Sequence, residues 1–162
     1  MADPSPFAAR MVAPFATLGI RTGGGAVTGI AYLPRDTLAL APTDAVAERT
    51  VRQLDRWLAD PQFRFDLPLA PSGTPFRHRV WHLLGTIPIG ESRTYGEIAR
   101  LLHTAPRAVG GACGANPIAL VIPCHRVVGN HGALGGFMHA ADGDPIAIKR
   151  WLLVHEGYRF GA

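Results

Sequence analysis

Asn116-Pro-Ile-Ala-Leu-Val-Ile-Pro-Cys-His-Arg-Val-Val128 is the stretch from which the rest of the chain can be interpreted. Its apolar run, Ile118–Ile122, lies between two prolines and is too short for a helix, which predicts a buried strand. Cys124, His125 and Arg126 follow directly. A cysteine alone is typically a small buried side chain, but a cation buried beside it without a partner would cost several kcal/mol. The adjacent thiol and imidazole therefore indicate a candidate activated nucleophile.

Composition limits the class of protein. The chain has 162 residues and 48% apolar residues, which suits one domain or two small lobes with a real core. No apolar run approaches the ~18 residues of a membrane span, and the first residues lack the features of a signal peptide. Two cysteines do not form a secreted disulfide framework. We therefore expect a cytoplasmic protein with no membrane partner.

The positive charge is confined to the second half of the chain. Residues 1–68 contain seven arginines and seven acidic residues, whereas residues 69–162 contain nine Lys and Arg against five acidic residues. The second half thus carries the whole formal net charge of +4. A basic half beside a neutral half favours contact between the second half and nucleic acid.

The first part of the chain reads as a scaffold. Strand-like runs at Phe15–Thr22 and Ala26–Leu33 are joined by Gly23–Gly25, which predicts a hairpin. Thr37–Ala41 is a candidate third strand. Asp44–Ala59 has apolar residues at helical spacing and predicts an amphipathic helix.

The predicted fold is mixed α/β (α+β) in two domains. Residues 1–13 are expected to be a poorly ordered lead-in, and the Pro-rich segment Pro68–Ser72 is the expected boundary. We predict a sheet-and-helix lobe over residues 1–70 and a second domain over residues 71–162.

Three short helices are predicted at the start of the second domain. Thr74-Pro75 begins the first, the capping box Thr94-x-x-Glu97 begins the second, and Pro106 begins a third that runs to about Gly114. Two helices joined by a short turn are typical of a helix-turn-helix, although many such pairs are only packing units. The third helix carries almost no bulky side chain, and its Gly-Gly pair costs roughly 1 kcal/mol per glycine relative to alanine. Close approach of another surface, inside or outside the protein, would explain that composition.

The remaining segments supply a pocket wall and a last helix. Residues 127–139 are Gly-rich but lack the spacing of a phosphate-binding loop, so they are predicted to form a pocket wall ending at Phe137. Asp144-Pro145 begins a helix with Ile148, Trp151 and Leu152 as its inward stripe. Glu156 stands at the unfavourable pole of that helix, where it is either solvated or orients a histidine.

These residues resemble the O6-alkylguanine-DNA alkyltransferases, also called methylated-DNA–protein-cysteine methyltransferases. The resemblance runs from Thr74 to Gly157. It includes Arg-Ala-Val-Gly-Gly-Ala-Cys-Gly-Ala-Asn-Pro (107–117), Ile-Pro-Cys-His-Arg-Val (122–127) and Trp-Leu-Leu-Val-His-Glu-Gly (151–157). It implies an RNase H-like N-terminal lobe and a winged-helix-like C-terminal domain with a helix-turn-helix.

The resemblance also implies a reaction. Cys124 would take the alkyl group from O6 of a damaged guanine, and O4-alkylthymine is left open as a second substrate. The thioether product has no easy exit, so the protein would be consumed after one transfer. His125 would activate the thiol through a water and Glu156 would hold the histidine, as in the serine triads. Because neighbouring side chains in an extended segment point apart, a bridging water is expected between Cys124 and His125.

The DNA-binding residues follow from the same resemblance. Tyr95 would serve the base and its 3′ phosphate, Asn116 would connect the recognition helix to the active-site strand, and Arg107 would fill the stack after the base flips out. The partner would be double-stranded DNA, bound largely without sequence preference in the minor groove by a monomer. The remaining predicted DNA contacts are Ala108, Gly111, Ala112 and Arg126.

The base pocket is predicted to include Val127, Phe137 and Met138. The segment Met138–Gly143 is longer than in many relatives, so the preferred size of the alkyl group is left open. No metal and no cofactor are expected, because residues 1–112 contain no cysteine and the histidines lack metal-ligand spacing. Cys113 is interpreted as a packing residue rather than a second acceptor.

Two other functions would use parts of the same sequence. Alkyltransferase-like proteins bind damaged DNA on the same scaffold without catalysis, but they replace the cysteine that is present here as Cys124. A thiol redox or hydrolytic enzyme would use Cys124 and His125, but it lacks a resolving cysteine at Cys-x-x-Cys spacing. It also gives no reason for Arg107 or for the smooth third helix.

Overall fold

Helices form where the sequence carries local start signals. The computed structural model describes residues 6–137 and 144–160. Asp44 and Thr74 each cap a helix by accepting a hydrogen bond from a backbone amide of the first turn, and Thr94 and Glu97 form the predicted capping box. The predicted helices are thereby confirmed. They are α1 (Ala45–Ala59), α2 (Pro75–Leu84), α3 (Tyr95–Leu101), α4 (Pro106–Gly114) and α5 (Asp144–His155).

The chain divides into two units. One contains the residues up to Ser72 together with Pro117–Ala119, and the other contains Gly73–Asn116 and the chain from Leu120 onward. The predicted division had assigned Pro117–Ala119 to the second domain. The reason for the difference is a pair of backbone hydrogen bonds that attach this segment to Ile30 of the first unit, at 2.9 and 3.1 Å.

The first unit is built on an antiparallel sheet in the order β1-β2-β3. The predicted hairpin is confirmed as β2 (Thr17–Gly23) and β3 (Ala26–Leu33). The third strand was predicted wrongly: it is β1 (Ala9–Val12), inside the segment expected to be poorly ordered. Thr37–Ala41 contributes only an isolated bridge from Leu40 to Arg10.

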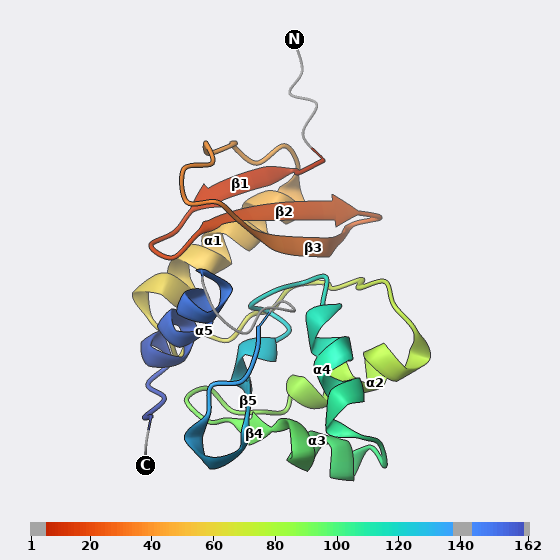
Figure 1. Cartoon of the computed structure of the whole chain (residues 1–162). Coiled ribbons are helices and arrows are strands. Elements are labelled where there is room, and N and C mark those ends of the chain that lie inside the picture. Colours follow the sequence, from red (N-terminus) through yellow and green to blue (C-terminus); the bar gives the residue numbers. More distant parts are fainter. Residues whose placement is uncertain (1–5, 138–143, 161–162) are drawn as a thin grey trace. The chain divides into compact units, whose positions relative to one another are not determined.

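Helix α1 covers one face of this sheet (Figure 1). Its buried residues are Ala47, Thr50, Leu54 and Trp57. The first unit therefore has a core of its own, formed by sheet and helix as in other two-layer α+β folds. The mixed α+β fold predicted from the sequence is confirmed.

The second unit contains α2, α3 and α4 packed on one another (Figure 1). α3 and α4 are joined by a short turn through His103, which has a positive φ of 55°. Val80, Ile98 and Val109 contribute one fully or nearly fully buried side chain from each helix. This arrangement of α3 and α4 matches the helix-turn-helix pattern seen in the sequence.

The run Ile118–Ile122 does not form the predicted strand. Ile118 makes an isolated bridge to Ile30, turns follow, and Leu120 has a positive φ of 72°. Cys124–Arg126 then form a single 3-10 turn, η1, so the premise that Cys124 and His125 lie on an extended segment was also wrong. The apolar run reflects burial on irregular backbone, which periodicity alone does not distinguish from a strand.

Two elements follow η1 and fix its position. β5 (Val127–Val128) pairs in parallel with β4 (Arg93–Thr94), the two residues before α3. A short 3-10 turn, η2, covers Asn130–Gly132. Because β4 leads directly into α3, the strand pair ties the segment that carries Cys124 to the helix that begins with Tyr95.

Helix α5 ends at a left-handed glycine. Gly157 has a φ of 86°, and the amides of Gly157 and Tyr158 bond back to the carbonyls of Val154 and Leu153 at 3.0 and 2.9 Å. This is a Schellman cap, which satisfies the last carbonyls of the helix. None of the helices in the described part of the chain has the length and apolar character needed to cross a bilayer.

Candidate active site

The thiol of Cys124 lies inside the second unit, on η1. It is 5% exposed. The side-chain amide of Asn116 donates to Cys124 Sγ at 3.1 Å and to the carbonyl of Ile122 at 2.8 Å. Asn116 therefore holds the thiol and the backbone before it in one position, which fits its predicted place between α4 and the cysteine segment.

Burial raises the pKa of the Cys124 thiol well above its ordinary value. The neighbouring Cys113 thiol raises it further, while the hydrogen bond from Asn116 and the positive charge of Lys149 lower it. Cys113 is half-buried on α4, so its place beside Cys124 was not evident from the sequence. At neutral pH Cys124 is protonated in this environment, and a nucleophilic role requires a base that removes the proton.

The imidazole of His125 is paired with Glu156 in a buried contact. His125 Nε2 lies 2.8 Å from Glu156 Oε1, and both side chains are 1% exposed. Glu156 is the residue just after α5, and the Schellman cap turns the chain there. Of the two interpretations of Glu156 left open by the sequence, solvated or orienting a histidine, the contact supports the second.

Arg126 completes this group, which we call the Glu156 cluster (His125, Arg126 and Glu156). Arg126 donates from Nε and Nη2 to the two carboxylate oxygens of Glu156 at 3.0 and 2.7 Å, and from Nη1 to the carbonyl of Ile87 at 2.8 Å. Its side chain is 12% exposed. Such a two-point pair is stronger and more directional than a single hydrogen bond. It gives Arg126 a different setting from the predicted DNA contact.

The cluster determines the protonation of its members. Burial acts to raise the pKa of Glu156, but the hydrogen bonds and charges of His125 and Arg126 outweigh it and lower that pKa to about 2. Burial lowers the pKa of His125, against the opposing effect of Glu156. At neutral pH the carboxylate is therefore ionised and the imidazole is neutral.

The tautomer of His125 follows from this pairing. An ionised carboxylate only accepts, so Nε2 carries the proton and Nδ1 carries the lone pair. Nδ1 is buried and has no hydrogen-bond partner among the described residues. A neutral imidazole with a free, buried lone pair next to Cys124 in the chain can act as a general base.

A second polar group surrounds Tyr95, the first residue of α3. Its hydroxyl donates to the carbonyl of Gly136 at 3.1 Å, and burial raises its pKa. Gly135 has a φ of 75°, and a Cβ there would lie 2.9 Å from Tyr95 Cε2. The backbone at residues 135–136 therefore packs closely on the tyrosine ring. This is part of the segment predicted to be a pocket wall.

Lys149 of α5 joins this group and was missed by the sequence reasoning. Its Nζ donates to the carbonyl of Gly136 at 2.8 Å and to the hydroxyl of Tyr95 at 3.4 Å. Its side chain is completely buried, as are those of Leu152 and Leu153. The predicted stripe of Ile148, Trp151 and Leu152 is thus correct only at Leu152, since the other two are half-buried.

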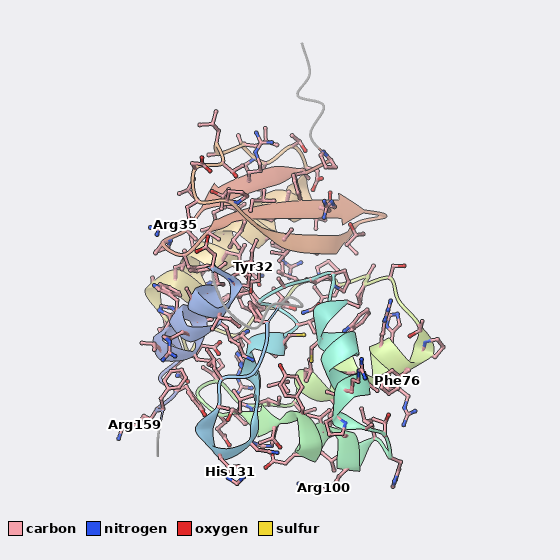
Figure 2. The ribbon with its side chains drawn as sticks, viewed as in Figure 1. Tyr32, Arg35, Phe76, Arg100, His131 and Arg159 are labelled. Atoms are coloured by element: carbon pink, nitrogen blue, oxygen red, sulfur yellow. The ribbon has the colours of Figure 1, made fainter. Side chains whose placement is uncertain are left out.

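The exposed side of α4 carries few side-chain atoms. Arg107 and Gly111 are exposed and Ala108 is half-buried. A Cβ at Gly110 or Gly111 would have no described atom within 4 Å, so packing inside the second unit does not require these glycines. Ala112 is buried, which contradicts its predicted place on the outer face: its carbonyl accepts from the indole of Trp81 at 2.9 Å. Arg100, labelled in Figure 2, is exposed at the end of α3.

Comparison with known proteins gives a family match over the second unit. The family model described as "6-O-methylguanine DNA methyltransferase, DNA binding domain" matches residues 75–158. The chain belongs to this methyltransferase family. The predicted resemblance is thereby confirmed, and the matched residues contain the whole Glu156 cluster, Asn116, Cys124 and Tyr95.

Two methylated-DNA–protein-cysteine methyltransferases illustrate the similarity in sequence. The Methanosarcina acetivorans protein is 48% identical over 108 residues, which are 65% of this chain and 66% of that protein. The Shigella flexneri protein is 50% identical over 94 residues, which are 57% of this chain and 52% of that protein. The chain thus spans between half and two thirds of the length of these relatives.

Two solved structures of methyltransferases share the fold over nearly the whole chain. Mycobacterium tuberculosis O6-methylguanine methyltransferase has a TM-score of 0.78 and 37% identity, with 91% of this chain and 90% of that chain covered. Mycobacterium tuberculosis OGT in complex with DNA has a TM-score of 0.77 and 38% identity, with 91% of each chain covered. The fold of the first unit, for which the sequence resembled the family only in outline, is therefore also that of the methyltransferases.

Two of the three residues predicted to form the base pocket lie within the described chain. Val127 is fully buried in β5, and Phe137 is 8% exposed with Lys149 Nζ 5.9 Å from its ring centre. Met138 falls outside the described residues. Among the described residues no group of three or more His, Cys, Asp or Glu side chains could hold a metal ion.

Proposed function

We propose that this protein repairs DNA directly by moving an alkyl group from O6 of guanine to its own Cys124. The sulfur forms a bond to the alkyl carbon as the bond from that carbon to O6 breaks. The electron pair goes to the purine, which then takes up a proton. The thioether is stable, so each molecule acts once and no cofactor is needed.

The observation that carries this proposal is the unpartnered Nδ1 of His125 in a histidine held by Glu156. Cys124 is protonated at neutral pH and needs a base. In this proposal a bridging water carries the thiol proton to His125 Nδ1. The Nε2–H group of His125 stays hydrogen-bonded to the carboxylate of Glu156. Glu156 thus stabilises the imidazolium that forms, as the aspartate does in the serine triads.

Arg126 acts in this scheme as a positioning residue. Its guanidinium is committed to both oxygens of Glu156 and to the Ile87 carbonyl. It keeps the carboxylate ionised and fixes its orientation toward His125. This role replaces the DNA contact predicted for Arg126 from the sequence.

The proposed partner is double-stranded DNA, bound through α3 and α4. The bare face at Gly110 and Gly111 allows close approach of the minor-groove walls, and few side chains there could distinguish bases. Arg107 would occupy the stack left by the flipped nucleotide, whose extrusion costs a few kcal/mol. Asn116 supports the thiol, while Tyr95, Val127 and Phe137 line the space for the base.

The test is intact mass spectrometry after incubation with O6-benzylguanine. We expect one benzyl adduct per molecule, located at Cys124 by peptide mapping, with one equivalent of guanine released. Cys124→Ser should remain unlabelled, and Cys113→Ser is the matched control that should be labelled like the unmodified protein. Release of many guanines per protein, or an adduct at Cys113, would contradict the proposal.

A further inference from the structure

The two cysteines of the chain, Cys113 and Cys124, meet inside the second unit. Cys113 lies in the last turn of α4 and Cys124 on η1, and their thiols share a hydrogen bond. Both are free thiols in the structure. The sequence argued against a redox role for Cys124 because it has no Cys-x-x-Cys motif, but the fold supplies a second sulfur from a different element.

Asn116 holds the two cysteines in this arrangement. Its backbone amide donates to the carbonyl of Cys113 at 3.2 Å, and its side-chain amide donates to Cys124 Sγ at 3.1 Å. The same turn of α4 is also fixed by Trp81, whose indole donates to the carbonyl of Ala112 at 2.9 Å. The contact between the two thiols is therefore built into the packing of the second unit.

This contact does not assist the alkyl transfer proposed for Cys124. Burial and the Cys113 thiol both raise the pKa of Cys124. A raised pKa leaves less of the thiolate, which is the form that attacks an alkyl carbon. The second thiol thus works against the nucleophile, and its place beside Cys124 needs a different explanation.

A pair of thiols in contact has a defined reaction with a peroxide. The sulfur of Cys124 attacks one peroxide oxygen, the O–O bond breaks, and the leaving hydroxide takes up the thiol proton to become water, so that Cys124 becomes a sulfenic acid. The sulfur of Cys113 then attacks the sulfur of Cys124, the S–O bond breaks, and a second water leaves with the proton of Cys113. In total the two thiols lose two electrons and two protons, and the peroxide is reduced to two waters.

We propose that Cys113 and Cys124 form a redox site that reacts with hydroperoxides, with Cys124 as the oxidised sulfur and Cys113 as the resolving one. A sulfenic acid without a neighbouring thiol is oxidised further to a sulfinic acid, which thiol reductants do not reverse. The internal disulfide instead keeps Cys124 in a form that a thiol reductant returns to the free thiol. Because Cys113 is half-buried and Cys124 is buried, the reductant attacks the sulfur of Cys113 and releases Cys124.

This redox reaction is independent of the proposed function. It needs neither DNA nor an alkyl donor, and its products are identified by mass. It does use the same sulfur, so oxidation should suspend alkyl transfer until the disulfide is reduced.

The experiment treats the reduced protein with hydrogen peroxide in the absence of reductant and digests it with trypsin. Cleavage after Arg107 and Arg126 leaves both cysteines in the single peptide 108–126. Cys113→Ser removes the resolving sulfur, and Cys113→Ala serves if the serine variant does not fold. Ala115→Ser places a hydroxyl at the residue that ends α4 and is the matched control. Thermal melting verifies the fold of each variant.

We expect peptide 108–126 of the unmodified protein to become lighter by two hydrogen atoms and to resist iodoacetamide until dithiothreitol is added. Labelling by O6-benzylguanine should be lost with peroxide and regained with dithiothreitol, and Ala115→Ser should behave in the same way. In Cys113→Ser, Cys124 should instead gain two oxygen atoms, and dithiothreitol should restore neither the thiol nor the labelling.

Three results would overturn the inference. The first is a gain of oxygen in the unmodified protein without the loss of two hydrogens, and the second is a disulfide that forms only between molecules on a non-reducing gel. The third is full recovery of the Cys124 thiol in both Cys113 variants. A protein that forms the internal disulfide but no benzyl adduct would refute the proposed function and leave the redox site in place.

Discussion

The Glu156 cluster and the exposed face of α4 differ in where their polar groups find partners. In the cluster, both carboxylate oxygens are bonded within the protein, by His125 and Arg126. On α4, Gly110 is half-buried and Gly111 is exposed, and a Cβ added at either position would meet no described atom within 4 Å. The carboxylate of the cluster has all its partners within the protein and only His125 Nδ1 is left without one among the described residues, whereas the α4 face offers bare backbone at Gly111 to solvent.

This difference suits the Glu156 cluster to the reaction and the α4 face to the recognition of a partner. A preorganised group such as the Glu156 cluster stabilises charge during a reaction because its partners are already in place. Its residues are also part of the core, so substitutions there should cost stability and activity together. The α4 face contributes little to the packing of the folded state, so substitutions there should affect the binding of a partner without destabilising the protein. Both expectations can be tested by measuring stability and transfer on the same variants.

The largest effect is expected for Glu156→Ala. Removing one partner of a buried ion pair leaves the Arg126 charge uncompensated, which typically costs about 3–5 kcal/mol. We also expect alkyl transfer to slow by roughly a hundredfold, the usual size of a lost general base, because His125 loses its orientation. Urea unfolding and the rate of O6-benzylguanine labelling provide the two readings.

Glu156→Gln is the control for this variant, since it keeps the shape and one acceptor oxygen. It should be less destabilised than the alanine variant while remaining slow in transfer. If Glu156→Ala were as stable as the unmodified protein, the ion pair of Glu156 with Arg126 would not contribute to stability as expected here.

The next largest effect is the loss of stability in acid. The folded pKa of Glu156 is about 2, below its ordinary value of 4.5, so its contribution is complete above pH 4.5 and is lost as the pH falls toward 2. A shift of this size corresponds to a stabilisation on the order of 3 kcal/mol. The lowered pKa of His125 adds a separate loss that begins below its ordinary value of 6.5.

Urea unfolding at a series of pH values can resolve these two contributions. Glu156→Gln should remove the part of the pH dependence below pH 4.5 and leave the part that begins near 6.5. If the stability curves of the variant and the unmodified protein coincide below pH 4.5, another carboxylate dominates acid unfolding.

The helices and the hairpin were predictable because their signals are local. Each of three helices begins with a capping residue that bonds to an amide within the first turn: Asp44, Thr74 and Thr94. Three consecutive glycines indicate the turn of the hairpin. The strand predicted at Ile118–Ile122 failed because an apolar run records burial and not backbone conformation. β1 was missed because a four-residue strand has too short a pattern to distinguish it from a loop.

The side chains of the site and the pairing of His125 with Glu156 were predictable from the resemblance to a family, but the partners of Arg126 and Lys149 were not. Helical spacing assigns charged residues outward by default, so it could not place Lys149 inside the protein or turn Arg126 toward Glu156. Both placements depend on segments far apart in the sequence, since Arg126 and Glu156 are separated by 30 residues. Such pairings are determined by tertiary packing, for which a single sequence carries no local signal.

A small effect on stability, and the clearest contrast with the Glu156 cluster, is expected at Gly111. Gly111→Ala adds a methyl group that meets no described atom and improves helix propensity, so it should stabilise the protein by roughly 1 kcal/mol. Gly111→Leu should also fold, because the space beside it is open. If α4 approaches DNA closely, the larger side chain should slow repair of O6-methylguanine in duplex DNA while labelling by free O6-benzylguanine stays unchanged.

Ala147→Leu is the matched control, because it places the same leucine side chain at an exposed position of α5. It should leave both rates as they are. Arg107→Ala should resemble Gly111→Leu, with a loss on duplex DNA and a change in stability within about 0.5 kcal/mol, as is usual for exposed positions. Equal losses on duplex DNA and on the free base would place Gly111 and Arg107 in the chemistry of transfer and not in recognition. That result would contradict the contrast between the two regions. The α4 face should influence the reaction at Cys124 only when DNA is bound, so a substitution there should leave labelling by the free base unchanged.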